Sequence, residues 1–209
     1  MQRQSFFKED FMFQTASGVT IPFPEKIKEE FQVFGTYIQF NLSFEKIRPM
    51  LDDFLEQLAE PLFIVLQFPL SQNEENEVRK KDTDPLHQKV CYLDGQSKKQ
   101  VQVILRQYGD LLLNDGISQF AVASHATGDE MFIQKYKLIN IYCSNPAKYF
   151  DFLKKYGLKQ TDNLITAWTS FSHETPGEAH CIKINGIDVF DVYDELVKMG
   201  MYDAKIIEG

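Results

Sequence analysis

SKKQVQVILRQYGDLLLNDGISQFAVASHATGDEMFI, residues 97–133, is followed by a second stretch that resembles it, NPAKYFDFLKKYGLKQTDNLITAWTSFSHETPGEAHCI, residues 145–182. The two align at an offset of 48 positions until one extra residue, Pro176, changes the offset to 49. The matches are Tyr108-Gly109 with Tyr156-Gly157, Ile117 with Ile165, Phe120 with Trp168, Ser124-His125 with Ser172-His173, Thr127 with Thr175, Gly128 with Gly177, Asp129 with Glu178, and Ile133 with Ile182. Matches in one register over such a length indicate an internal duplication.

Each copy begins with a pattern typical of an amphipathic helix. Apolar residues recur at i, i+3, i+4 and i+7, which places them on one helical face: Val101, Ile104, Leu105 and Tyr108 in the first copy, and Tyr149, Phe152, Leu153 and Tyr156 in the second. Ser97 and Asn145 are suitable N-caps. Gly109 and Gly157 occur where a left-handed C-cap is favoured, so we expect the helices to end there.

Each helix is followed by strand-forming residues, a polar turn and a second strand-forming run. The ranges are 117–124, 125–130 and 131–142 in the first copy, and 165–172, 173–178 and 179–184 in the second. The unit is therefore predicted to be helix, strand, turn, strand.

The rest of the chain resembles an earlier, diverged copy. A strand at 36–42, a helix at 43–59, and strands at 62–68 and 88–93 are predicted, with the hairpin turn replaced by the polar excursion 71–84. Before them we expect a short hairpin or arm at 1–23 and a short helix at 24–34. A closing helix at 187–199, ended by Gly200, completes the pattern.

These elements predict an α+β fold with a mixed, mainly antiparallel sheet, built from repeated α-β-β units with helices packed on one face. We expect a single domain over 1–209. Its repeat units would be about 37–93, 97–142 and 145–184, followed by the closing helix.

Composition excludes several classes of function. The net charge of −8 and the lack of a basic stripe argue against binding to nucleic acid or to an anionic membrane. The charge permits a basic protein partner, although acidity also serves solubility. Three widely spaced cysteines without a CxxC pair indicate a reducing compartment, and no apolar run approaches the length of a membrane span. We therefore expect a cytoplasmic protein.

Familiar catalytic motifs do not occur. The sequence contains no glycine-rich phosphate loop, GxGxxG, GxSxG, HExxH or four-ligand zinc pattern, so no cofactor is predicted.

The candidate site residues lie in the two matching turns, within 124–130 and 172–180. Imidazole beside carboxylate is both a metal ligand and a tunable base. Candidates for catalysis are His125, His173, Glu130 and Glu178; for binding, Ser124, His125, Asp129, Glu130, Ser172, His173 and Glu174; and for a metal, His125, His173 and His180. The alternative explanation is local turn chemistry, since Ser, Thr, Asp, Pro and Gly are the residues that tight turns need.

Two hypotheses of function follow. The first is a cytosolic binding or inhibitor protein, in the manner of an immunity protein, which acts on a protein partner through an acidic surface. The second is a metal-assisted hydrolase or lyase that uses the histidine-containing turns. The second hypothesis requires the two turns to emerge at the same edge of the sheet, with His125 and His173 near a common point.

Overall fold

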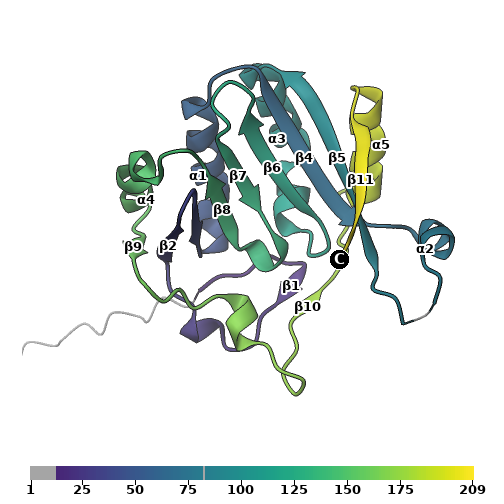
Figure 1. Ribbon diagram of the computed structural model, residues 1–209, viewed down its shortest axis with the longest axis horizontal. Coiled ribbons are helices and arrows are strands. Elements are labelled where there is room, and N and C mark those ends of the chain that lie inside the picture. Colours follow the sequence, from purple (N-terminus) through teal and green to yellow (C-terminus); the bar gives the residue numbers. More distant parts are fainter. Residues whose placement is uncertain (1–12, 82) are drawn as a thin grey trace, which may run out of the picture.

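The computed structural model describes residues 13–81 and 83–209, and its main feature is a nine-stranded sheet (Figure 1). The strands follow the order β11-β5-β4-β6-β7-β8-β3-β2-β9. Their bounds are β2 Glu30–Phe34, β3 Tyr37–Phe40, β4 Leu62–Pro69, β5 His87–Gln96, β6 Gln119–Ser124, β7 Glu130–Ile133, β8 Ile139–Tyr142, β9 Lys159–Gln160 and β11 Tyr202–Glu208. Every neighbouring pair is antiparallel except β2 and β9. The predicted mixed, mainly antiparallel sheet is confirmed.

Helices cover one face of this sheet, as predicted. The α-helices of the described chain are α1 Phe44–Gln57, α2 Gln72–Val78, α3 Lys98–Asn114, α4 Phe150–Lys155 and α5 Val189–Lys198. The apolar stripes of α1, α3 and α5 join one core cluster with the inward residues of the strands. In β4, for example, Leu62, Ile64 and Leu66 belong to that core. Phe63 and Val65 alternate with them and point to the opposite face, which no helix of the described chain covers (Figure 1).

Helix α3 extends beyond the end expected at Gly109. It runs to Asn114 because Leu111, Leu112 and Leu113 continue to bury apolar surface. Gly109 lies instead inside the helix, against α1. A Cβ at this position would lie 2.6 Å from Nη1 of Arg48, which donates a hydrogen bond to the carbonyl oxygen of Leu105. The glycine therefore makes room for a contact between helices and does not cap one.

The second copy of the repeat keeps its helix and loses its hairpin. The strand predicted at 165–172 is wrong: the segment contains a short 3-10 helix, Ala167–Ser170. The strand predicted at 179–184 shortens to β10, Glu178–Ala179, which pairs with β1, Val19–Thr20, in a separate two-stranded sheet. Local bonding replaces strand pairing here, since Ser172 Oγ accepts from the backbone N–H of Thr175 at 3.0 Å.

One further expectation near the N-terminus is corrected, and another lies partly outside the described residues. The helix predicted at 24–34 is a 3-10 turn, Pro24–Lys26, followed by β2, because 30–34 forms a tight hairpin with β3 through Gly35 at φ +59. Of the arm predicted at 1–23, residues 1–12 lie outside the described chain.

The polar excursion and the C-terminal segment each contain an element that was not predicted from the sequence. The excursion 71–84 contains α2, where Glu75 is buried and binds the Nδ1 of His87 at 3.0 Å. Beyond the predicted closing helix, which α5 confirms, the sequence analysis missed β11.

Residues 178–182 reach the end of α3 at a closely packed junction, which we call the Asp115–Gly116 junction. The N–H of Gly116 donates to the carbonyl of His180 at 2.9 Å, and the N–H of His180 donates to the carbonyl of Gly18 at 2.8 Å. The carboxylate of Asp115 accepts from the N–H of Ser118 at 2.8 Å and from that of Ile182 at 3.1 Å. These bonds fix the second histidine-containing segment at the C-terminal end of α3.

Lys137 is buried against the same junction. Its ammonium donates to the carbonyl of Asp115 at 2.5 Å, which completes the helix end. Burial lowers the pKa of Lys137 from 10.5 to about 8, while the nearby charge of Asp115 acts in the opposite direction.

This lowered pKa predicts a pH-dependent stability. Between the two pKa values the unfolded chain binds more protons than the folded protein, so stability rises with pH. From about pH 7.5 to about pH 9.5, we expect the free energy of unfolding to rise by about 2 kcal/mol more in the wild type than in Lys137→Gln. Urea unfolding across this range measures the difference. Equal slopes in the two proteins would show that Lys137 titrates as an exposed lysine does.

Candidate functional site

The two histidine-containing turns lie at opposite ends of the sheet. The carbonyl of His180 bonds to Gly116, just before β6, whereas His125 follows β6 directly. The six residues of β6 span about 20 Å. The expectation that both turns emerge at one edge is therefore wrong.

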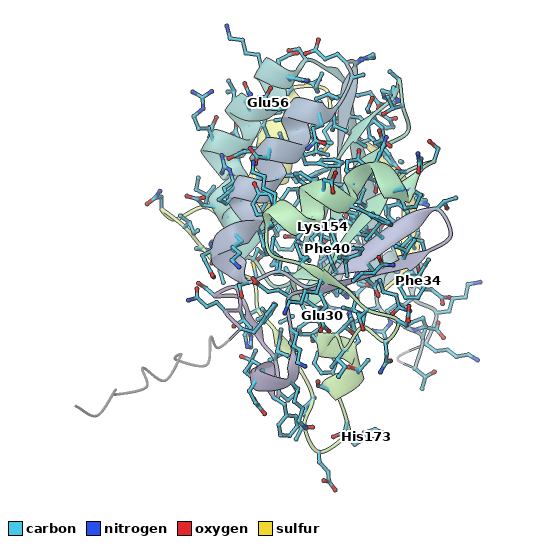
Figure 2. The ribbon with its side chains drawn as sticks, turned by 90° about the vertical axis from the view of Figure 1, so that its left-hand side faces the viewer. Glu30, Phe34, Phe40, Glu56, Lys154 and His173 are labelled. Atoms are coloured by element: carbon cyan, nitrogen blue, oxygen red, sulfur yellow. The ribbon has the colours of Figure 1, made fainter. Side chains whose placement is uncertain are left out.

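Figure 2 shows the same separation of the turns. His173 lies at the lower end of the molecule and Glu56, near the end of α1, at the upper end. The Oγ of Ser124 donates to the carbonyl of Ala59, only a few residues beyond Glu56, at 2.5 Å. Because the lower turn is held by the Asp115–Gly116 junction, His125 and His173 do not approach a common point.

Two of the predicted binding residues in the first turn hold the turn itself together. Ser124 is buried, and its hydroxyl accepts from the N–H of Thr127 at 3.3 Å in addition to bonding Ala59. Asp129 is buried, with its carboxylate 2.5 Å from the ammonium of Lys148. Both side chains therefore serve the local structure, which fits the explanation by turn chemistry.

His125 joins a different group of residues on the helix-free face. Its Nε2 lies 2.9 Å from Oδ1 of Asp94 in β5, and its ring lies 4.4 Å from that of Phe63. The other carboxylate oxygen of Asp94 accepts from the hydroxyl of Tyr202 in β11 at 2.6 Å. Tyr202 stacks on Tyr92, its cross-strand partner, with ring centroids 6.3 Å apart. Strands β4, β5 and β11 therefore meet the first turn at one end of this face.

Glu130 completes the group. It begins β7, and because Met131 points into the core, Glu130 points to the helix-free face. Its cross-strand neighbours are Ala123 on one side and Tyr142 on the other. Ala123 is itself opposite Phe63, so the row across the sheet places a carboxylate between aromatic residues.

The carboxylate of Glu130 has no hydrogen-bond or ion-pair partner within residues 13–81 and 83–209. The side chain is half-buried, and burial raises its pKa above the usual 4.5. An unpaired carboxylate in apolar surroundings carries a desolvation cost that a cation would relieve.

We call this group the open-face patch. It consists of Phe63, Tyr92, Asp94, His125, Glu130, Tyr142 and Tyr202. Two carboxylates and four aromatic rings lie together there, without a lysine or arginine among them. Of these residues, only His125 and Glu130 were predicted from the sequence. Asp94 and Tyr202 are more than a hundred positions apart, and no local pattern reports their pairing.

The second turn is exposed and separate. His173 lines a shallow hollow with Phe171, Ser172, Pro176 and Gly177. Nε2 of His180 lies 3.4 Å from Oε2 of Glu178, and both side chains are 61% exposed, while Glu174 extends into solvent. Across the described part of the chain, no three histidine, cysteine, aspartate or glutamate side chains are arranged to hold a metal ion.

Comparison with known proteins adds no information about these features. None of the helices in residues 13–81 and 83–209 has the length and apolar character that crossing a membrane requires. Neither a protein-family model, nor a curated protein, nor a solved structure matches this chain.

Proposed function

We propose that this protein is a cytoplasmic binding or inhibitor protein, of the immunity-protein kind, that binds a basic protein partner through the open-face patch. The observation that carries the proposal is Glu130, a half-buried carboxylate without a partner in the described chain, between Tyr142 and the Ala123–Phe63 pair. A lysine or arginine side chain from a partner would supply the missing charge, and the neighbouring rings would add cation–π contacts.

The composition of the patch supports a protein interface. Tyrosine side chains are frequent among the residues that dominate binding energy, and the patch contains Tyr92, Tyr142 and Tyr202. The net charge of −8 adds long-range attraction for a basic partner, which increases the association rate. Three free cysteines, two of them buried, are consistent with a reducing compartment.

An NMR titration tests where a basic ligand binds. We expect octalysine, added to ¹⁵N-labelled protein at low ionic strength, to shift amide signals around Asp94, His125 and Glu130. Octaglutamate serves as the control probe and should leave those signals unchanged. Shifts centred on the acidic residues of α1, or spread evenly over the surface, would contradict the proposal.

The same interaction should depend on pH. Because burial raises the pKa of Glu130, its carboxylate becomes protonated at a higher pH than an exposed glutamate does. Octalysine stays charged throughout this range. We therefore expect its affinity to be highest above the pKa of Glu130 and to fall as the pH decreases through it, as measured by calorimetry in steps from about pH 7 to about pH 4.5. In Glu130→Gln this step should disappear; a decrease that persists unchanged in that variant would assign it to other ionisable groups.

A further inference from the structure

Strand β11 forms an edge of the nine-stranded sheet. It pairs with β5 on one side, and in the described chain no strand pairs with its other side (Figure 1). Six of its seven residues are exposed. At the opposite edge, β9 contains two residues. Within residues 13–81 and 83–209, β11 is therefore a long strand edge with no strand paired to its outer side.

An edge of this kind offers backbone hydrogen-bonding groups to another extended chain. Residues 202–208 contain no proline that would remove a donor. The side chains of Tyr202 and Ile206 are 50% and 49% exposed and supply apolar contacts next to those groups. Backbone pairing and side-chain contacts are the two elements of recognition by strand addition.

The charge around the edge favours a basic segment over a second copy of this chain. Residues 188–209 contain six acidic and two basic side chains, a net charge of −4, of which Lys183 and Lys89 offset part by pairing with Asp188 and Asp203. Two copies of the chain pairing edge to edge would bring these like charges together. A basic segment from another protein does not meet this repulsion, because its charge is complementary.

The edge is continuous with the open-face patch. Tyr202 belongs to both, since it begins β11 and its hydroxyl binds Asp94. A strand added beside β11 would lie about 4.8 Å from it and would carry alternate side chains onto the face that holds the patch. We propose that an extended basic segment of the partner adds to the sheet along β11, with its basic side chains directed toward Asp94 and the rest of the patch. This inference rests on the proposed function and adds the mode of binding.

Amide hydrogen exchange of residues 202–208, followed by NMR, tests strand addition. The probe is an eight-residue peptide of alternating lysine and valine, and the control is the same peptide with every backbone amide nitrogen methylated. The control keeps the charge and the side chains but loses backbone donors. We expect the unmethylated probe to slow exchange of the outward-facing amides of β11 at least tenfold, and the methylated probe to leave them unchanged.

Each other outcome overturns the inference in a distinguishable way. If both probes shift the signals of Asp94 and Glu130 while exchange in β11 stays fast, strand addition is wrong and the proposal of a basic partner stands. If neither probe shifts any signal, both proposals are wrong. If exchange in β11 slows with protein concentration and no probe, the occupant is a second copy of this chain.

Discussion

Gly116→Ala is expected to destabilise the protein by about 3 kcal/mol or more. A Cβ at this position would overlap the carbonyl oxygen of Gly18 and would lie 2.7 Å from the backbone nitrogen of His180. Both atoms belong to the backbone, so no side-chain rotation relieves the overlap. The strands β1 and β10 would have to move away from the end of α3, with loss of the bonds that hold residues 178–182 there.

Gly35→Ala provides the matched control for this prediction. Gly35 has φ +59, and a Cβ there would meet no atom within 4 Å. Its replacement carries the cost of a left-handed alanine, about 1 kcal/mol, and no steric overlap. Urea unfolding of the two variants compares them directly. If Gly116→Ala is no less stable than Gly35→Ala, the close approach of β1 and β10 to α3 is incorrect.

Asp115→Ala should also cost about 3 kcal/mol or more. The carboxylate is fully buried and accepts from the backbone N–H groups of Ser118 and Ile182. It also offsets part of the burial penalty on Lys137. Alanine would leave two buried donors unsatisfied and a buried ammonium with less compensation.

Two further variants separate the contributions of Asp115. Asp115→Asn keeps one acceptor oxygen and should lose less stability than the alanine variant. Asp110→Ala removes a carboxylate whose side chain is 82% exposed, 3.7 Å from Arg48, and should change the free energy of unfolding by less than about 0.5 kcal/mol. Thermal or urea unfolding that places Asp115→Ala level with Asp110→Ala would contradict the buried role of Asp115.

Elements with one buried face were predictable from the sequence. The helical periodicity of Ile47, Leu51 and Phe54 identified α1, and that of Val189, Val192 and Leu196 identified α5, because each stripe packs into the same core. Strand β4 was found as a short, nearly continuous apolar run after Pro61, because most of its residues are buried. Strand β11 escaped prediction because nearly all of its residues are exposed, so burial leaves no alternation in its sequence.

In the repeat, two segments of similar sequence adopt different structures. Phe120 is buried in β6, whereas its counterpart Trp168 is 47% exposed and packs edge-on to Tyr136. The two segments differ in the neighbours available to them. Residues 119–124 lie between β4 and β7, while residues 167–170 pair with no strand of the described residues and close into a 3-10 turn.

The candidate site was also only partly predictable from the sequence. His125 and Glu130 were found because turns between strands concentrate polar side chains. Their partners Asp94, Tyr92 and Tyr202 were missed because they come from β5 and from the undetected β11. Long-range pairing assembles the open-face patch, and a single sequence contains no local pattern for it.

The affinity of octalysine for wild type, Glu130→Gln and Asp151→Asn tests the central claim most directly. Glu130→Gln removes the charge while keeping the shape of the side chain. Asp151, on α4, has a side chain that is 99% exposed and serves as the matched control. By calorimetry at low ionic strength, we expect Glu130→Gln to bind about tenfold more weakly, equivalent to about 1.4 kcal/mol, and Asp151→Asn to bind as the wild type does. Equal affinity in the wild type and Glu130→Gln would contradict binding of a basic partner at Glu130.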